Sequence, residues 1–378
     1  MKTDDFPPAL EEFGPRPALN MPASEYQGRM KRLVKLVKRL KLDAVLLFDE
    51  LTNYYFTGLA SDNGVLEVRA GEEPVYRTDF RYLVMAKRVA PWLKSETLWK
   101  PKDEGAVLEG LFEGARRIGF EGSLPAARYK TLSAALPAVE WVDIRSELLM
   151  LRAVKSPAEQ RAIRKAVAYN DAVLQSWIPH RKEGETEWEI RTKIRGLMDY
   201  VGQGEAFDTI VCVGKNGAEC HHEPDETVYT KGKPLLIDMG VKVDRYCSDM
   251  TRCICWGRPS KLFRELHGIV HEANRAAIAA VKPGAVCADI DAVARGVIEK
   301  AGYGPAFAHS LGHGVGLFIH ESPNFSSHCK TVLEPGMVIT VEPGIYLPGR
   351  AGVRLEDMVL VTKTGCEVLT QTPHDLFL

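Results

Sequence analysis

Carboxylates set inside apolar stretches are the residues of this sequence best suited to carry chemistry. The run KPLLIDMGVKVDRYCSDMTRCICW is strand-like and mostly apolar, yet it contains Asp238 and Asp249. If the chain reverses near Val243 and Asp244, the two aspartates become directly opposed on adjacent strands. Opposed residues have Cβ atoms about 4.5–5.5 Å apart, and like charges at that distance repel each other. The pattern therefore predicts a pair of acidic groups that needs a balancing cation.

A second acidic pair follows in VEPGIYLPGRAGVRLEDMVLV, where Glu342 and Glu356 are symmetric about Gly349. Buried carboxylates lose their hydration without compensation, so four of them among apolar residues require cations. Two divalent ions would cancel four carboxylate charges, and His313 can add a neutral nitrogen ligand. Such a donor set favours Mn²⁺, Co²⁺, Fe²⁺ or Zn²⁺, among which the sequence does not choose. A water molecule held between two such ions loses a proton near neutral pH, so we expect hydrolytic chemistry.

Each of these acidic residues, taken alone, could instead be an exposed carboxylate at a strand end. That alternative has to hold for all four candidates at once. Strand alternation sends Asp244 and Asp357 to the opposite face, and we expect both to be exposed. Asp357 could also hydrogen-bond to a metal ligand.

The segment HSLGHGVGLFIHE crowds His309, His313 and His320 together with three glycines. Glycine lacks a Cβ atom and tolerates close contact, so we expect these glycines to let the backbone approach the metals and the substrate. Histidines in a glycine-rich turn can also be ordinary hydrogen-bonding loop residues. Elsewhere, His267 and His271 lie one helical turn apart, a spacing that can bind zinc. No acidic third ligand accompanies this pair, so the expected alternative is a solvated helix face.

The elements that must position these residues fall into two parts, because a chain of 378 residues is too long for one ordinary core. Residues 1–150 alternate helix-like and strand-like pieces and predict a small, non-catalytic α/β domain. Its expected helices and strands are ASEYQGRMKRLVKLVKRLKL, DAVLLFD, PVYRTD, residues 80–90, RIGFEG and VEWVDI.

Residues 151–378 are expected to form the domain that carries the acidic pairs. Ser156 and Pro157 supply an N-cap and a first helical residue for a long amphipathic helix. Helices over 157–181 and 186–200 precede strands over 208–214 and 233–256, and helices over 259–281 and 287–301 precede strands from 306 to 370. This order predicts a duplicated unit of a helix pair and an antiparallel sheet, which is an α+β fold.

The composition is that of a globular protein, with 45% hydrophobic and 26% charged residues. The 49 basic and 50 acidic residues nearly cancel, so no charge pattern indicates nucleic acid or an anionic membrane as a partner. No secretory signal or membrane span is visible, which predicts a cytoplasmic protein. The eight cysteines are scattered, and Cys247, Cys253 and Cys255 are expected to be reduced core residues.

Five motifs, in this order and spacing, resemble those of the pita-bread metallopeptidases: IDMG, YCSDMTR, HSLGHGVGLFIHE, VEPGIY and GVRLEDM. The similarity is to the branch that contains Xaa-Pro dipeptidase (prolidase) and aminopeptidase P. The motifs span residues 237–358, and residues 152–166 resemble the entry helix of that branch. The preceding residues resemble its creatinase-like N-terminal domain more loosely. The resemblance implies a C-terminal pita-bread domain with pseudo-twofold halves.

The resemblance also implies which residues bind metal. The five implied ligands of two divalent ions are Asp238, Asp249, His313, Glu342 and Glu356. Asp249 and Glu356 would bridge the ions, and Asp238 would chelate one of them. Glu342 would also act as general base.

Further residues are implied to contact substrate. His221, or its neighbour His222, would bind substrate and stabilise the tetrahedral intermediate, and His320 would donate to the substrate or the departing group. His309 would line the substrate pocket or support a ligand. Arg354 lies two residues before a ligand on the same strand face, so we expect it to contact a ligand carboxylate or the substrate, with a surface salt bridge as the alternative.

The implied function is hydrolysis of the bond before proline at a peptide N-terminus. The short spacing between Glu342 and Glu356 is similar to that of the compact prolidases, so an Xaa-Pro dipeptidase is the first expectation. An aminopeptidase P acting on longer peptides is the second, and a creatinase-like hydrolase or lyase acting on a small non-peptide metabolite is the third. A binding module without activity is expected to have lost a ligand, and none is lost here.

The partners follow from the same resemblance. We expect a short proline-containing peptide as substrate and no nucleic-acid or membrane partner. We also expect a homodimer in which the N-terminal domain contributes to the contacts or closes the pocket.

Overall fold

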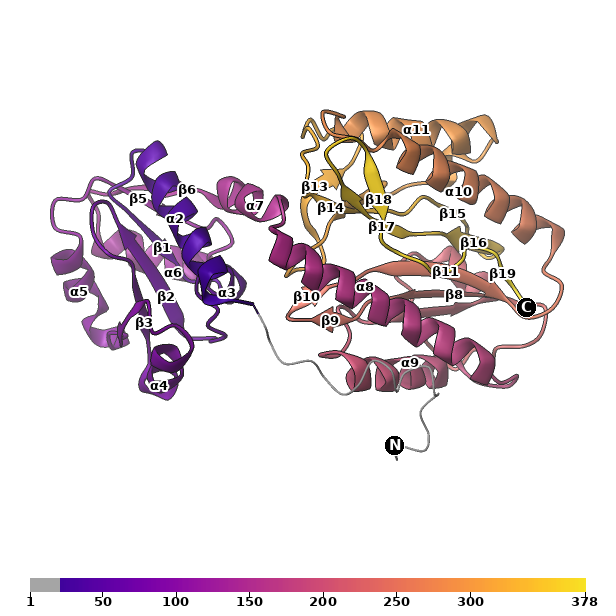
Figure 1. Cartoon of the computed structure of the whole chain (residues 1–378), viewed down its shortest axis with the longest axis horizontal. Helices are drawn as coiled ribbons and strands as arrows, with labels where there is room; N and C mark the ends of the chain where they lie inside the picture. The colour runs from indigo at the N-terminus through magenta and orange to yellow at the C-terminus, as the bar shows by residue number, and fades with distance from the viewer. Residues whose placement is uncertain (1–20) are drawn as a thin grey trace. The chain divides into compact units, whose positions relative to one another are not determined.

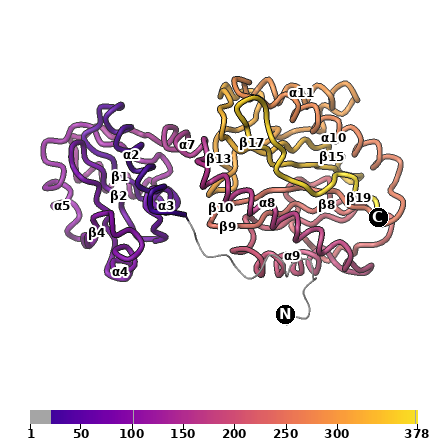
Figure 2. Tube along the Cα trace, viewed as in Figure 1, coloured from indigo at the N-terminus to yellow at the C-terminus, as the bar shows by residue number. Residues whose placement is uncertain are grey.

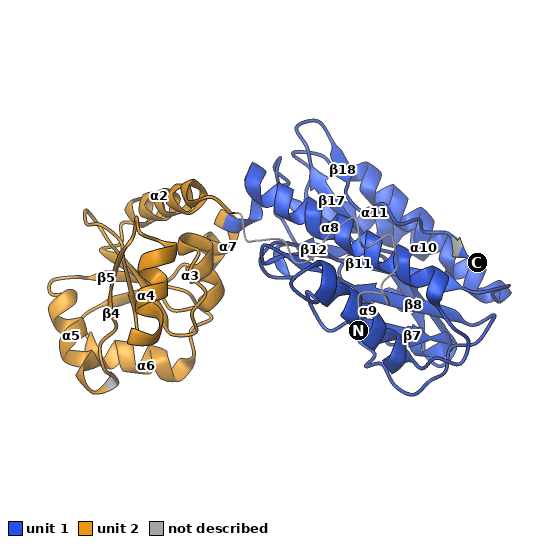
Figure 3. Ribbon diagram, turned by 60° about the horizontal axis from the view of Figure 1, so that its bottom comes forward, with its two compact units in different colours: residues 1–20, 152–378 blue, residues 21–151 orange. Residues whose placement is uncertain are grey.

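The structure is a computed structural model that describes residues 21–378. These residues form two compact units, Met21–Leu151 and Arg152–Leu378, drawn in different colours in Figure 3. Among the described helices, none has both the length and the apolar character needed to cross a bilayer.

The first unit is a mixed six-stranded sheet with the strand order β4-β3-β2-β1-β5-β6 (Figure 1). The strands are β1 (Ala44–Leu47), β2 (Gly64–Arg69), β3 (Val75–Thr78), β4 (Lys94–Thr97), β5 (Arg117–Phe120) and β6 (Glu140–Asp143). The helices are α2 (Ala23–Arg39), α3 (Glu50–Thr57), α4 (Phe80–Val89), α5 (Glu104–Leu111), α6 (Ala126–Ala135) and α7 (Arg145–Ala153). The α/β character expected from the sequence is confirmed.

Strand β2 lies in the middle of this sheet and was not expected. It contains Glu67, which is only 1% exposed and would break an apolar strand pattern. The carboxylate pairs with Nε of Arg69 at 2.8 Å and with Nε of Arg77 at 2.7 Å. The two arginines therefore balance the buried charge of Glu67. A charged residue in the strand is the reason that the apolar pattern did not predict β2.

The second unit consists of two halves of the same kind, which follow one another along the chain except that the last strand, β19 (Leu376–Phe377), joins the sheet of the first half (Figure 2). In the first half, α8 (Pro157–Trp177) and α9 (Glu187–Val201) accompany a sheet of order β19-β11-β8-β7. In the second half, α10 (Lys261–Ala280) and α11 (Cys287–Lys300) accompany a sheet of order β13-β12-β14-β17-β18. In Figure 1, α10 and α11 lie above the strands and α9 lies below them.

The strands of the second unit are antiparallel to their neighbours except where β11 pairs with β19. The two sheets contain β7 (Ile210–Val213), β8 (Pro234–Met239), β11 (Met250–Cys255), β12 (Gly312–Gly314), β13 (Glu321–Phe325), β14 (Val338–Val341), β17 (Asp357–Val361), β18 (Cys366–Val368) and β19 (Leu376–Phe377). Two further ladders pair β9 (Lys242–Val243) with β10 (Tyr246–Cys247) and β15 (Gly344–Leu347) with β16 (Ala351–Arg354). The predicted α+β fold is confirmed.

Helix α8 begins where the sequence predicted. Oγ of Ser156 accepts from the backbone N–H of Glu159 at 3.3 Å, and the Glu159 carboxylate accepts from the backbone N–H of Ser156 at 2.8 Å. Pro157 occupies the first helical position, where a missing N–H group costs nothing. This capping box starts the helix that opens the second unit.

Matching contacts show that the two halves are repeats. Gly184 and Gly284 both have positive φ (94° and 82°), and each precedes the second helix of its half by three residues. The N–H of Gly184 donates to the carbonyl oxygen of Tyr229 at 3.0 Å, and that of Gly284 donates to Leu333 at 2.9 Å. The segments KEGETEWEI and KPGAVCADI share Lys, Gly and Ile at the same spacing. This local identity is a repeat signal that the sequence analysis missed.

A pair of buried asparagines repeats in the same way. Nδ2 of Asn170 on α8 donates to the carbonyl oxygen of Met239, and Nδ2 of Asn274 on α10 donates to that of Val341, both at 2.9 Å. The asparagines are 1% and 0% exposed. Each accepting residue adjoins a candidate metal ligand in the sequence, so the first helix of each half anchors the strand end that carries the ligand.

The first acidic hairpin has a different register from the expected one. Asp238 on β8 pairs with Thr251 on β11, so Asp249 lies two residues from the position directly opposite. The reversal is centred on Asp244 and Arg245, which both have positive φ (50° and 66°). Two such residues form a two-residue hairpin turn, and this shifts the turn by one residue. The prediction of directly opposed aspartates is therefore wrong.

The second acidic hairpin has the expected register. β15 pairs with β16 around Gly349, whose φ is +70°, and β14 pairs with β17 so that Val341 is opposite Asp357. Both ladders share one centre, and the register that continues through them places Glu342 opposite Glu356. The predicted symmetry about Gly349 is confirmed.

Candidate metal centre

Three candidate ligands meet in the second unit. Asp249, His313 and Glu356 each offer one ligand atom, and these atoms lie within 4.8 Å of one another. Nε2 of His313 lies 3.6 Å from Oδ2 of Asp249 and 3.3 Å from Oε1 of Glu342. Asp249 directly precedes β11, His313 is the middle residue of β12, and Glu356 directly precedes β17. The cluster therefore draws on strands from both halves.

Asp238 is linked to this cluster through Arg354. Oδ2 of Asp238 accepts a hydrogen bond from Nη2 of Arg354 at 2.6 Å. Nε of Arg354 donates to Oγ1 of Thr251 at 3.0 Å, and Oγ1 of Thr251 donates to Oε2 of Glu356 at 2.8 Å. Arg354, Thr251 and Glu356 are 3%, 0% and 1% exposed. A buried arginine and a buried hydroxyl thus join a carboxylate of the first hairpin to one of the second.

Burial and mutual repulsion oppose the ionisation of three of these carboxylates. Burial, together with the negative charges nearby, raises the pKa of Asp238, Asp249 and Glu356 above the ordinary range. Burial also disfavours the charge of Glu342, but the hydrogen bond and the charge of His313 lower the pKa of Glu342 to about 2. The same contact outweighs burial at His313 and raises its pKa. Without further cations the site is short of positive charge.

The donor atoms of the cluster fit divalent metal ions. Within the described part of the chain, Oδ1 of Asp238 and Oε1 of Glu356 are buried without a hydrogen-bond partner. Such oxygens are costly unless something coordinates them. Nδ1 of His313 lies 3.1 Å from the carbonyl oxygen of Gly314. Because that nitrogen donates, Nε2 is the nitrogen that faces the carboxylates, and it could coordinate an ion on losing its proton. Oxygen donors with one imidazole suit first-row divalent ions.

Two threonines that the sequence analysis missed orient the ligands. Oγ1 of Thr340 accepts from the backbone N–H of His313 at 3.0 Å and donates to Oε1 of Glu342 at 3.1 Å. Thr340 lies two residues before Glu342, and Thr251 lies two residues after Asp249. Strand alternation places residues two apart on one face, so this spacing was the available signal.

His320 and His221 are both exposed, and His320 lies beside the cluster. The ring of His320 stands edge-on to the ring of His313, with centroids 4.4 Å apart. Burial lowers the pKa of His320, and the charges of His313 and His221 lower it further. The two exposed histidines are therefore within electrostatic reach of each other, whereas His222, the neighbouring alternative, is buried.

His309 is held by internal partners. Its Nδ1 lies 2.8 Å from the carbonyl oxygen of Ser310, and its Nε2 lies 2.9 Å from the hydroxyl of Tyr346. That hydroxyl also accepts from Nη1 of Arg354 at 2.9 Å. A hydrogen-bonded chain thus runs from Arg354 through Tyr346 to His309, and a substrate contact of His309 stays a prediction.

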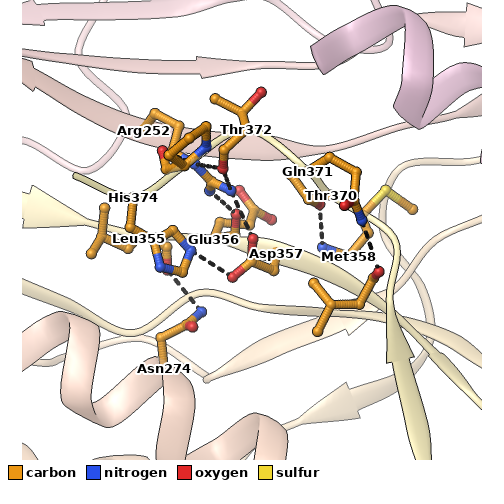
Figure 4. Close-up of polar contacts among 12 residues, drawn as sticks. Arg252, Asn274, Leu355, Glu356, Asp357, Met358, Thr370, Gln371, Thr372 and His374 are labelled. Atoms are coloured by element: carbon orange, nitrogen blue, oxygen red, sulfur yellow. Dashed lines mark hydrogen bonds and ion pairs between the residues drawn. The ribbon is translucent and has the colours of Figure 1, made fainter. Parts of the chain in front are cut away.

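Asp357 is buried on the strand that follows Glu356, and Figure 4 shows it between Arg252 and His374. Its Oδ1 accepts from Nη2 of Arg252 at 2.8 Å, and its Oδ2 lies 2.7 Å from Nε2 of His374. Nη1 of Arg252 also donates to the backbone oxygen of Glu356. The expectation that Asp357 is exposed is wrong, because Arg252, itself 1% exposed, balances its charge.

The histidine pair on α10 is not a solvated face either. His267 is 3% exposed, and its Nε2 lies 3.2 Å from the carbonyl oxygen of His374. Neither His267 nor His271 belongs to the groups of potential metal ligands found among the described residues. His267 packs the C-terminal segment against α10.

The glycines of the histidine-rich segment make room for protein atoms. A Cβ atom on Gly312 would lie 2.2 Å from the backbone oxygen of Thr340, and one on Gly316 would lie 2.4 Å from Oε2 of Glu321. The contacts that these two glycines permit are therefore with a neighbouring strand and with a buried carboxylate. The expectation that they admit metals and substrate is corrected accordingly.

Two family models match the chain. The model for metallopeptidase family M24 matches residues 161–363, and the model for the creatinase/prolidase N-terminal domain matches residues 29–154. The first covers the helices and strands that carry every candidate ligand.

Individual relatives are similar over nearly the whole chain. An Xaa-Pro dipeptidase from Pyrococcus furiosus is 36% identical over 92% of this chain and 99% of its own length. The crystal structure of a prolidase from Pyrococcus horikoshii OT3 has a TM-score of 0.87 at 34% identity, covering 93% of this chain and 100% of its own. An X-Pro aminopeptidase from Thermotoga maritima MSB8 has a TM-score of 0.82 at 31% identity, covering 90% and 99%. The chain therefore belongs to metallopeptidase family M24, with a creatinase/prolidase N-terminal domain ahead of its catalytic domain.

Proposed function

We propose that this protein is a metal-dependent Xaa-Pro dipeptidase, which hydrolyses the bond before proline in a dipeptide. The observation that carries the proposal is the buried cluster of acidic groups around His313, in a chain that is 36% identical to an Xaa-Pro dipeptidase from Pyrococcus furiosus over 92% of its residues. A cluster of this kind is costly in an apo protein and is useful in a hydrolase.

The five residues that we propose as ligands of two divalent ions are Asp238, Asp249, His313, Glu342 and Glu356. The orphaned oxygens of Asp238 and Glu356 support this set, as do the raised pKa values of Asp238, Asp249 and Glu356. When bound, Mn²⁺, Co²⁺, Zn²⁺ or Fe²⁺ ions supply Lewis acidity and lower the pKa of water.

The chain's own residues have separate tasks in this proposal. Glu342 is ionised at neutral pH because its pKa is lowered to about 2, and it can accept a proton while Thr340 holds its Oε1. His320 is neutral at pH 7 because its pKa is lowered, so one ring nitrogen can donate to the departing group while the other accepts. His221 is exposed and within electrostatic reach of His320, and in this proposal it donates to the substrate oxygen on which charge develops.

The test is to compare Leu-Pro, Leu-Pro-Ala and Leu-Ala as substrates of the Mn²⁺-loaded protein. We expect Leu-Pro to be hydrolysed with the highest kcat/KM and Leu-Ala with the lowest. Failure to hydrolyse any proline peptide, with metal bound, would instead favour a small non-peptide substrate.

A second candidate is an aminopeptidase P that acts on longer peptides. The observation in its favour is the TM-score of 0.82 with the X-Pro aminopeptidase from Thermotoga maritima. A higher kcat/KM for Leu-Pro-Ala than for Leu-Pro would decide for this candidate.

We also propose that the protein works in the cytoplasm. All eight of its cysteines are free, and five of them are buried. Unpaired cysteines are the usual state in a reducing compartment.

A further inference from the structure

The carboxylate of Glu187, the first residue of α9, is hydrogen-bonded to several groups of one loop. Its side chain is fully buried. Four groups approach its two oxygens: the backbone N–H of Val213, Nδ2 of Asn216 at 3.0 Å, Nε2 of His222 at 2.7 Å and the backbone N–H of Asp225 at 3.1 Å. All four belong to the segment 213–225. The exposed His221 lies near the middle of this segment, far in sequence from α9.

His222 is the inward-pointing half of the pair His221–His222. It is 9% exposed, with Nε2 on Glu187 and Nδ1 3.3 Å from Oε2 of Glu219. Burial opposes its charge, but hydrogen bonding to Glu187 raises the pKa of His222 above the usual 6.5. The N–H of His222 donates to the carbonyl oxygen of Glu219 at 3.3 Å and closes a turn that contains His221. His222 is buried at the end of this turn while His221 is exposed, and the charge of His221 acts on His320.

The same three residues, Glu187, His222 and Asp225, also offer ligand atoms within 4.8 Å of one another. A metal ion there would have to displace the N–H groups that already occupy the Glu187 oxygens. The cluster is therefore organised by hydrogen bonds within the chain.

We propose that Glu187 and His222 form a positioning pair that holds His221 against the substrate. This inference rests on the proposed function, in which His221 donates to the substrate. Loops are the most mobile parts of a fold, and a displacement of about 1 Å at a catalytic group can cost about 100-fold in rate. A buried carboxylate with four donors supplies the rigidity that the loop needs.

The first experiment compares Glu187→Gln with Glu189→Gln. Glu189 lies in the same helical turn, but its carboxylate accepts from the backbone N–H of Thr186 and does not contact the loop. On Leu-Pro with Mn²⁺, we expect Glu187→Gln to lower kcat about 10- to 100-fold with a smaller change in KM, because orientation is lost while metal binding is kept. We expect Glu189→Gln to stay within about twofold of the unmodified protein.

A mutant cycle separates positioning from a general loss of structure. If Glu187 acts through His221, then adding Glu187→Gln to His221→Ala should lower kcat by less than about twofold relative to His221→Ala alone. His222→Leu should resemble Glu187→Gln, and His222→Gln should retain more activity because an amide N–H can still donate to Glu187. If Glu187→Gln lowered kcat by the same factor in the His221→Ala protein as in the unmodified protein, the inference would be overturned.

A measurement without substrate keeps this inference distinct from the proposed function. Hydrogen–deuterium exchange should accelerate over residues 214–227 in Glu187→Gln and not in Glu189→Gln, while bound Mn²⁺ is unchanged. Unaltered exchange in the loop would overturn the positioning role whatever the substrate is. Inactivity of the unmodified protein on proline peptides, with loop exchange as expected, would reject the dipeptidase and retain Glu187 and His222 as the pair that orders the loop.

Discussion

Arg354 is a buried cation of the acidic cluster. Burial disfavours its charge, but Tyr346, Asp238 and Glu342 raise the pKa of Arg354 well above the ordinary value. Arg354 and His313 together cannot balance four carboxylates, and burial with the uncompensated negative charges raises the pKa of Asp249 and Glu356. Divalent ions are the remaining way to keep these carboxylates ionised at neutral pH.

At this scale we expect Asp249→Asn to abolish metal binding while the fold survives. The change keeps the size of the side chain and removes the negative charge and one oxygen donor. Loss of a residue that merely supports a ligand costs about 10- to 100-fold, so turnover of Leu-Pro should fall at least about 100-fold. Metal analysis of the purified protein, with circular dichroism for the fold, checks this expectation.

Asp244→Asn is the matched control for that change. Asp244 lies at the hairpin turn with φ of 50°, a conformation that asparagine also tolerates. It should retain metal and activity. An Asp249→Asn protein that binds Mn²⁺ as the unmodified protein does would show that the site is assigned to the wrong residues.

Among the elements, β12 is a strand whose packing leaves little room for side chains beside His313. It carries His313 between Gly312 and Gly314, and it pairs with β13 on one side and β14 on the other. Backbone oxygens of those strands lie where side chains at the two glycines would be. The strand therefore presents one imidazole from a position where its immediate neighbours cannot have side chains.

Gly312→Ala should destabilise the protein by about 1–3 kcal/mol, as overpacking does, because the new Cβ meets a backbone oxygen that cannot rotate away. Gly268→Ala is the matched control, since Gly268 lies inside α10 with nothing within 4 Å of the added Cβ. It should stabilise the helix by up to about 1 kcal/mol. Urea denaturation of both variants measures the difference, and equal stability of Gly312→Ala and the unmodified protein would contradict the packing argument.

The whole molecule presents an unpaired apolar face on its N-terminal unit. Phe80 and Val84 on α4 are 80% and 78% exposed, and residues four apart lie on the same side of a helix. Large exposed apolar residues in neighbouring positions mark surfaces that bind a partner. If the protein is the expected homodimer, we predict that this face forms the contact.

Phe80→Asp combined with Val84→Asp should convert a dimer into a monomer, because two charges would be desolvated at the contact. Val293→Asp on α11, where the apolar side chain is 38% exposed, is the control and should leave the mass unchanged. Size-exclusion chromatography with light scattering at micromolar concentration measures each mass. A monomeric unmodified protein would count against the homodimer, and a dimeric double variant would place the contact elsewhere.

The sequence by itself determined most of the elements and the set of candidate ligands. Helix caps such as Ser156, the apolar periodicity of the helix pairs and the symmetry about Gly349 are local properties, so they can be read without knowing distant contacts. The resemblance to one metallopeptidase branch likewise needed only five short motifs in order.

Only the tertiary structure decided the register of the first hairpin, the burial of Asp357 and the opposite orientations of His221 and His222. Each of these depends on groups far away in the sequence, such as Arg252 for Asp357 and Glu187 for His222. Sequence reasoning predicts that a charged residue is exposed unless its buried partner is known. The opposite charge of that partner is what offsets the free-energy cost of burying the residue. For that reason the sequence was enough to predict the chemistry of the site, and only the fold showed which side chains hold the candidate ligands in place.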